Sequence, residues 1–179
     1  MLPITLIISL LFVFSVNADQ NDERLEGLFE ILSKTESDIQ INKVTSSIWD
    51  IWHETNDSSI DADFYRGLES MRTGDLLMAV AFFTRVIDNN PNFAEGWNKR
   101  ATVYYMLGKF DASMKDIRET LNLEPRHFGA MDGMGLIFIH LEQFDKAIDI
   151  YDQMLQIFPN NSFTIQKKEI LINRLSDSA

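Results

Sequence analysis

The sequence predicts an all-α protein, an α-α superhelix of three helix-turn-helix repeats with flanking helices. Two observations predict it. An apolar pattern returns every 34 residues, and Pro91, Pro125 and Pro159 follow one another at the same interval. Because proline cannot continue a helix from inside, each of these prolines marks an equivalent helix boundary.

The composition limits what kind of protein this can be. The chain has 179 residues, of which 45% are hydrophobic, and this is enough for one ordinary core. It carries 27 acidic and 16 basic side chains and a net charge of -11, so we expect no nucleic-acid partner. There is no cysteine, which excludes a disulfide framework and thiolate chemistry.

The first element is an apolar stretch without charges, from Leu2 to Val16. It is shorter than the roughly 20 residues that a membrane-spanning helix needs, and small residues follow it. This pattern predicts a signal peptide over residues 1–18, cleaved after Ala18. An uncleaved membrane anchor is the alternative, because no Lys or Arg precedes the apolar stretch. We expect an exported protein without stable membrane insertion, in a bacterial periplasm since cysteines are absent, or secreted.

Residues 19–57 are predicted to form a helical hairpin. Its two apolar stripes are Leu25, Leu28, Phe29 and Leu32, and then Val44, Ile48, Ile51 and Trp52. The favoured interpretation is a degenerate additional repeat that buries these stripes against its neighbour. The alternative is a separate docking hairpin. Burial of Trp49 and Trp52 in the array would favour the first, and their exposure the second.

Residues 58–161 hold the three repeats, which we place at 60–93, 94–127 and 128–161. Gly74 and Gly108 supply left-handed backbone between the two helices of the first and second repeats. The third repeat has Glu142 there, and because a side chain in this conformation costs about 1 kcal/mol, we expect that turn to be built differently. A small residue lets the paired helices approach closely in each repeat: Gly67, Ala101 and Gly135.

The middle repeat carries the clearest motif, in the stretch WNKRATVYYMLGKF. Its characteristic residues are Trp97, Ala101, Tyr104, Gly108, Phe110 and, after the second helix, Pro125. At these positions the chain resembles the tetratricopeptide repeat family, over about residues 60–161. The first and third repeats match more loosely, with Asp63 and Met131 in place of the tryptophan. The resemblance implies a right-handed superhelix that holds extended or helical peptide segments in its concave groove.

Residues 162–179 are predicted to form a capping helix. Ser162 can cap its start, and Ile165, Ile172 and Leu175 recur on one face that we expect to pack inward. Lys167 and Lys168 are then expected to point outward into solvent.

The groove should be lined by the other stripe of each first helix. Its apolar residues would make hydrophobic contacts with a partner, and Asn98 and Thr102 would recognise the partner through hydrogen bonds. The predicted partner-binding residues are Phe64, Leu68, Met71, Arg72, Asn98, Thr102, Tyr105, Asp132, Leu136 and Ile139. The family's clamp for a terminal carboxylate is not expected, because Phe64 and Leu68 stand where it would begin.

No catalytic or metal-binding pattern emerges from the sequence. The three histidines, His53, His127 and His140, fall in three different elements without a second ligand at metal-site spacing. We therefore expect no metal, no cofactor and no enzymatic activity. Arg66 and Arg100 occupy equivalent positions, where they either pair with acids such as Glu69 or Asp116 or face an anionic partner.

The sequence thus predicts an exported scaffold that binds a protein or peptide partner in a concave groove at the cell envelope. Two alternatives stay open. One is an accessory subunit of an envelope enzyme that docks through its N-terminal helices, and the other is a holdase-like chaperone. The identity of the partner and the oligomeric state cannot be read from the sequence.

Overall fold

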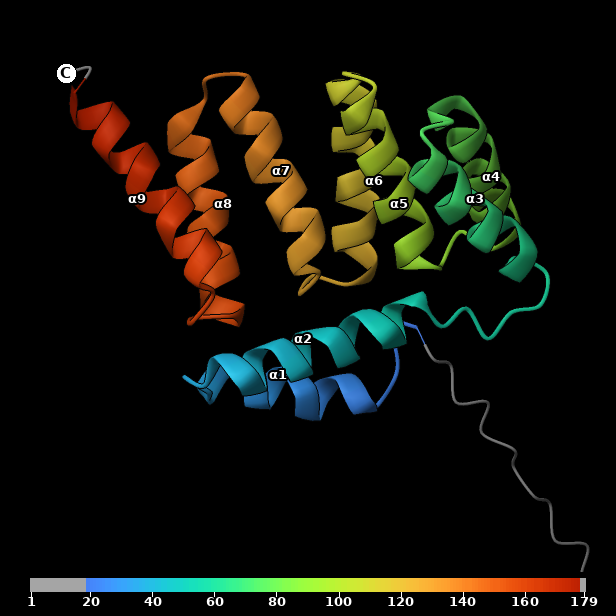
Figure 1. Ribbon diagram of the computed structural model, residues 1–179, viewed down its shortest axis with the longest axis horizontal. Coiled ribbons are helices and arrows are strands. Elements are labelled where there is room, and N and C mark those ends of the chain that lie inside the picture. Colours follow the sequence, from blue (N-terminus) through green and yellow to red (C-terminus); the bar gives the residue numbers. More distant parts are fainter. Residues whose placement is uncertain (1–18, 178–179) are drawn as a thin grey trace, which may run out of the picture.

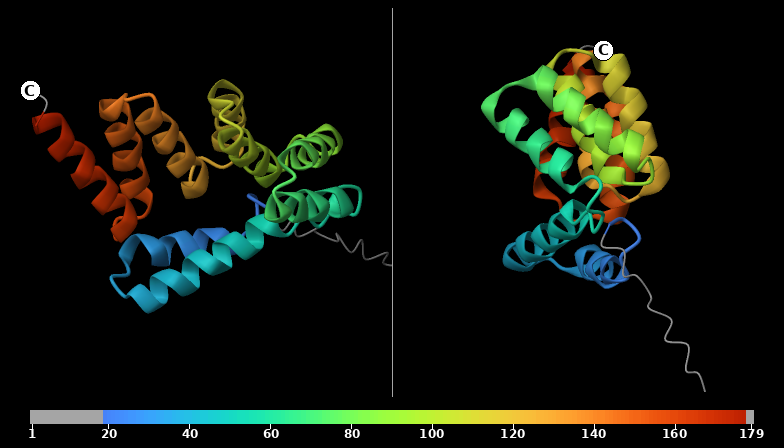
Figure 2. Two further views of the ribbon diagram at one scale, coloured as in Figure 1. Left: turned by 45° about the horizontal axis from the view of Figure 1, so that its top comes forward. Right: turned by 90° about the vertical axis from the view of Figure 1, so that its right-hand side faces the viewer.

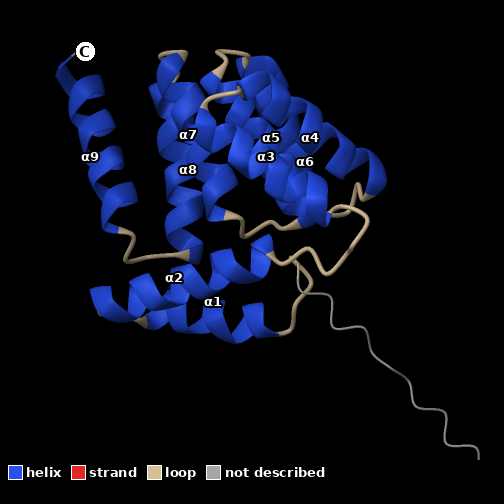
Figure 3. Cartoon of the chain, turned by 45° about the vertical axis from the view of Figure 1, so that its right-hand side comes forward, coloured by secondary structure: helices blue, strands red, loops and turns tan. Residues whose placement is uncertain are grey.

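The computed structural model describes residues 19–177, so the predicted signal peptide lies outside the described residues. Within that range the chain forms nine helices and no strand (Figure 3). The helices are α1 (Arg24–Lys34), α2 (Asp38–His53), α3 (Asp61–Thr73), α4 (Leu76–Asn89), α5 (Ala94–Met106), α6 (Phe110–Leu123), α7 (Phe128–His140), α8 (Phe144–Ile157) and α9 (Ser162–Asp177).

Three helix pairs stand side by side in sequence order, α3 with α4, α5 with α6, and α7 with α8, and α9 follows at the end (Figure 1). Each helix packs mainly on its neighbours in the chain, as expected of a solenoid. The predicted all-α array of three repeats is confirmed.

The turn inside each repeat has one residue with left-handed backbone at the equivalent position. Its φ angle is 82° at Gly74, 71° at Gly108 and 56° at Glu142. The expectation that the third turn is built differently is therefore wrong. Packing of the two helices around it holds Glu142 in a conformation that favours glycine.

The small residues have the predicted role. A Cβ atom on Gly67 would lie 2.6 Å from the ring of Phe83, and one on Gly135 would lie 2.6 Å from the ring of Tyr151. In the first and third repeats the second helix therefore places an aromatic ring directly on the backbone of the first helix.

The N-terminal hairpin lies crosswise under the array, along the ends of the helices (Figure 2). It contacts the α4–α5, α6–α7 and α8–α9 connections. Gln20 donates to the carbonyl of Asn92 at 2.5 Å and accepts from Ala94 N–H at 3.2 Å. Glu26 pairs with Arg126 at 3.0 Å. The Thr35 carbonyl accepts a hydrogen bond from Asn160 at 2.8 Å. The hairpin thus braces the array across its length.

This placement differs from that of an additional repeat in series. α1 packs on α8 and α2 packs on α5, so the hairpin spans the array instead of extending it beyond α3. The aromatic end of α2 accounts for the difference, because Trp52 is 1% exposed and stacks on His127 with ring centroids 4.0 Å apart. The buried faces of α1 and α2 share one core with Phe128 and Tyr151.

The C-terminal helix α9 is rotated relative to the prediction. Its buried residues are Thr164 and Leu171, whereas Ile165 and Ile172 are 37% and 46% exposed. The lysines account for the rotation, because Lys167 and Lys168 turn toward the array and pair with Asp132 of α7 and Asp152 of α8. Asn161, not Ser162, caps the helix, accepting from the Thr164 N–H at 3.1 Å.

Candidate functional site

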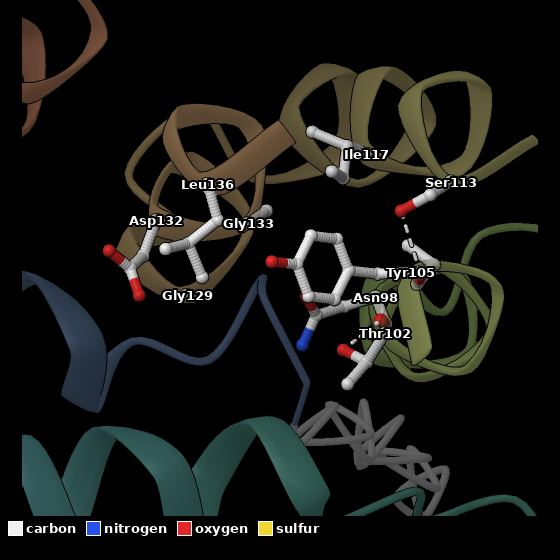
Figure 4. Close-up of a pocket in the computed structure, with 11 residues that line it drawn as sticks. Asn98, Thr102, Tyr105, Ser113, Ile117, Gly129, Asp132, Gly133 and Leu136 are labelled. Carbon is white, nitrogen blue, oxygen red and sulfur yellow. Dashed lines mark hydrogen bonds between the residues drawn. The ribbon is translucent and has the colours of Figure 1, made fainter. Parts of the chain in front are cut away.

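A cavity of about 180 Å³ opens between the middle turns of α5 and α7. α5 contributes Asn98, Thr102 and Tyr105, α7 contributes Gly133 and Leu136, and α6 contributes Ser113 and Ile117 (Figure 4). A second, wider cavity of about 330 Å³ adjoins it and is bordered by α2, α7, α8 and α9. Gly129 and Asp132 line both, so the two cavities form one continuous depression, which we call the groove.

The far part of the groove is aromatic. Its lining includes Trp49 from α2, Phe128 from α7, and Phe163 and Lys167 from α9. Phe163 is 74% exposed, the largest exposure among the big apolar side chains of the array and its cap. The groove therefore runs from a small-residue pocket on α5 to an exposed aromatic side chain on α9.

Half of the predicted binding residues line this groove: Asn98, Thr102, Tyr105, Asp132 and Leu136. The others lie elsewhere on the array. Leu68 and Met71 pack against the core of the first repeat, and Ile139 packs against the main core. Arg72 is exposed and pairs with Glu69 of its own helix at 2.5 Å.

Phe64 was predicted to line the groove but is 0% exposed. It is the first-repeat counterpart of Asn98 and Asp132, one and two periods earlier in the chain. Here the last turn of α2 lies over it, with the rings of Phe64 and His53 centred 6.1 Å apart, and Phe93 packs on it from the other side at 5.2 Å. The hairpin thus closes the first-repeat end of the groove.

The sequence analysis missed the contributions of α2 and α9. For α9 the signal was present in the 34-residue period, because Phe163 follows Gly129 and Ile170 follows Leu136 at that interval. For Trp49 no such signal exists, since its place on Gly129 depends on how the hairpin folds back. A Cβ atom on Gly129 would lie 2.5 Å from the Trp49 ring.

Beside the groove, a buried carboxylate joins three helices. Glu95, in the first turn of α5, is 1% exposed. Its oxygens lie 2.9 Å from Nε2 of His127, the residue before α7, 3.0 Å from His53 Nε2 of α2, and 2.8 Å from Lys99 Nζ. Asn98 Nδ2 donates to it at 2.9 Å. We call these five residues the Glu95 cluster.

The Glu95 cluster is built to hold a negative charge. Burial favours the neutral acid, but Lys99 and the imidazoles of His127 and His53 outweigh it and hold the pKa of Glu95 well below its usual value. Nδ1 of His127 accepts from the Ala130 N–H at 3.1 Å and so caps α7, which leaves Nε2 to donate to Glu95. The cluster therefore fastens the hairpin to α5 and α7.

The two arginines that the sequence singled out differ in their surroundings. The guanidinium of Arg100 forms two hydrogen bonds to the carboxylate of Asp116, at 2.7 and 2.9 Å, as one alternative predicted. Arg66 is exposed. Between residues 19 and 177, no group of three or more His, Asp or Glu side chains could hold a metal ion.

Comparison with known proteins identifies the repeat. Two family models described as tetratricopeptide repeat match residues 82–115 and 130–161. A TPR repeat-containing protein of Rhizobium etli is 27% identical over 86% of this chain and 76% of its own length. Residues 82–115 and 130–161 thus carry tetratricopeptide repeats. Its resemblance to a bacterial relative over most of both chains is consistent with a bacterial origin.

Solved structures show the same fold. The first tetratricopeptide domain of Spaghetti (RPAP3), bound to the HSP90 peptide SRMEEVD, superposes with a TM-score of 0.62 at 20% identity, covering 66% of this chain and 96% of that domain. The TPR2B domain of yeast Sti1 in complex with an Hsp70 peptide gives 0.61 at 19% identity, covering 69% of this chain and all of that domain. Hsp70-Hsp90 organizing protein 1 of Glycine max is 29% identical over 46% of this chain, and the match spans only 14% of that protein's length.

Proposed function

We propose that this protein is a scaffold that binds a segment of another protein in the groove between α5, α7 and α9. The observation that carries the proposal is an open cavity between α5 and α7, which adjoins a second cavity lined by an exposed aromatic side chain. The structural neighbours described above hold peptides, which supports a protein or peptide as the ligand. The proposal includes no catalytic step.

The ligand is not expected to be an acidic peptide of the kind bound by those neighbours. Asp132 and Lys167 are the charged residues that line the groove, and they pair with each other at 2.5 Å. A ligand carboxylate would have to compete with Asp132 for the lysine, on a chain with a net charge of -11. We infer a partner segment that enters without a carboxylate of its own.

The accessory-subunit alternative depends on a free aromatic surface on the hairpin. Trp52 is buried, and Trp49 packs on Gly129 and lines the groove, so neither ring forms a separate docking surface on the hairpin. The outer side of the hairpin keeps a shallow cavity near Leu28 and Ile31, and Ile31 is 39% exposed. This surface is the one to test against the groove.

We further propose that the protein acts at the cell envelope after export. The support is the apolar, uncharged stretch within residues 1–18. From residue 19 to residue 177, no helix has the length and hydropathy required to cross a membrane. The test is N-terminal sequencing of the protein from a periplasmic fraction. A first residue of Asp19 is expected, and retention of Met1 would contradict cleavage.

Site-specific crosslinking in living cells tests the binding surface. A photoreactive phenylalanine replaces Tyr105 in the groove, Ile31 on the hairpin, or Arg118 on the exposed face of α6. The groove proposal predicts one discrete adduct from position 105 and none from positions 31 and 118. An adduct from position 31 alone would favour the accessory subunit, and many weak adducts from position 105 would favour the chaperone.

A further inference from the structure

The pocket at the α5 end of the groove is walled by small residues. Ala101 lies on one side, and Ala130 and Gly133 lie on the other. A Cβ atom on Gly133 would approach only Ile117 Cδ1, at 3.4 Å, so this side of the pocket is open for lack of a side chain. At Gly67 and Gly135 the space above the glycine is filled by an aromatic ring, whereas at Gly133 nothing fills it.

Three of the polar side chains around this pocket donate hydrogen bonds within the chain. Ser113 Oγ donates to the Ala101 carbonyl at 2.7 Å, and Thr102 Oγ1 donates to the Asn98 carbonyl at 2.9 Å (Figure 4). Asn98 Nδ2 donates to Glu95 at 2.9 Å. Much of the remaining lining is apolar, with Ala101, Ile117, Ala130 and Leu136, so a polar ligand group would give up more hydrogen bonds to water than it could regain here. Asn98 and Thr102, for which the sequence predicts hydrogen bonds to a partner, each donate one hydrogen bond within the chain.

The size of the pocket matches one side chain. Its volume is about 180 Å³. An apolar protein cavity of about 150 Å³ is known to accept benzene. Tyr105 flanks the opening, and its ring packs edge-on against Phe110 with centroids 5.6 Å apart, so the aromatic wall is held in place. One phenyl, isobutyl or thioether group fills such a space.

We propose that this pocket is a specificity site for a single large, uncharged apolar side chain, of the Phe, Leu or Met class, carried by the partner segment. The proposal rests on the function proposed above and names the residue class that anchors the partner. The adjoining aromatic part of the groove, with Trp49 and Phe163, then receives the flanking part of the segment. A charged side chain is excluded from the pocket, because no counter-charge lines it except Asp132, which is paired with Lys167.

Methyl NMR of residues 19–179, which contain the whole described fold, tests the proposal without knowledge of the partner. The probes are the N-acetyl amides of phenylalanine, leucine, aspartate and lysine. The proposal predicts saturable shifts of the Ala101, Ile117, Ala130 and Leu136 methyl groups with the first two probes, at millimolar dissociation constants. The aspartate and lysine probes should bind at least about tenfold more weakly.

A pocket-filling variant provides the control. Gly133→Leu should abolish the saturable shifts, and Gly133→Ala should weaken them. Gly27→Leu makes the same change on α1, where a Cβ atom would meet nothing within 4 Å, and should leave the shifts unchanged. Absence of saturable shifts, equal binding of the charged probes, or full binding by Gly133→Leu with an intact spectrum would overturn the proposal.

Different results would refute the groove function and the pocket proposal. If a partner is crosslinked through position 105 but Gly133→Leu captures it as well as the unchanged protein does, the pocket proposal is wrong and the groove function stands. If the apolar probes bind and no partner is found, the pocket exists and the scaffold function is wrong.

Discussion

The first turns and the middle turns of α5 and α7 face the same side of the array but differ in what covers them. At the first turns, α2 fills the space with Trp49, Trp52 and His53. One or two turns further along, Ala101 and Gly133 leave a pocket that no side chain of the described part enters. The comparison shows that this protein closes one part of its concave side with its own hairpin and leaves the neighbouring part open. Closed packing supports the fold, and the open part is available to a ligand.

The largest expected effect on stability comes from a substitution in the closed part of the concave side. Glu95→Gln removes the charge that His127, Lys99 and His53 surround, and leaves Lys99 without its partner. We expect the free energy of unfolding at pH 7 to fall by about 3 kcal/mol, the order seen when one member of a buried ion pair is removed. Chemical denaturation followed by circular dichroism measures it. A loss below about 1 kcal/mol would show that the cluster does not fasten the hairpin.

Lowering the pH should reduce the stability of the protein in part through the same residue, Glu95. The folded-state pKa of Glu95 is lowered from its ordinary value of 4.5, so its stabilising contribution is present above pH 4.5 and is lost as the pH falls further. The stability difference between the native protein and Glu95→Gln should therefore shrink below pH 4.5. A difference that stays constant from pH 7 to pH 3 would contradict this assignment.

A matched pair of glycines sharpens the comparison. Gly129 and Gly133 are one turn apart on α7, but a Cβ atom would lie 2.5 Å from Trp49 at the first and 3.4 Å from Ile117 at the second. Gly129→Leu should cost about 2 kcal/mol by overpacking, whereas Gly133→Leu should change stability by less than about 1 kcal/mol. Thermal and chemical unfolding measure both. Equal losses would mean that the pocket is not open.

The smallest effect concerns the third turn. Glu142 has a φ of 56°, in the region that Gly74 and Gly108 occupy in the other repeats. Glu142→Gly should therefore stabilise the protein by about 0.5 to 1 kcal/mol, because glycine adopts this conformation without steric cost. A melting temperature that falls instead would show that the glutamate side chain contributes a contact of its own.

Much of the fold could be predicted from the sequence because repeat contacts are local. The 34-residue period located the helix pairs, and the small residues at Gly67 and Gly135 implied close helix contacts that the structure contains. The placement of the hairpin was not predictable in this way. It depends on Glu95 of α5, His53 of α2 and His127 at the start of α7, which are far apart in the sequence and meet only in the folded chain.

The site was predictable in part for the same reason. The prediction that one face of each first helix lines the groove was right for Asn98, Thr102 and Leu136, which occupy that face in the second and third repeats. It placed Phe64 wrongly because a non-repeating element covers it. The pocket itself arises from an absent side chain at Gly133, and helical periodicity does not distinguish such a glycine from the closely packed one at Gly135.

Affinity of the crosslinked partner for two charge variants tests the central claim most directly. Leu136→Glu places a carboxylate in the groove, and Ile31→Glu places one on the outer face of the hairpin, with circular dichroism to confirm that both remain folded. If the groove is the binding surface, Leu136→Glu weakens binding by at least about a hundredfold, as expected for a central contact, and Ile31→Glu leaves it within about twofold. Unchanged binding by Leu136→Glu together with loss in Ile31→Glu would contradict the account.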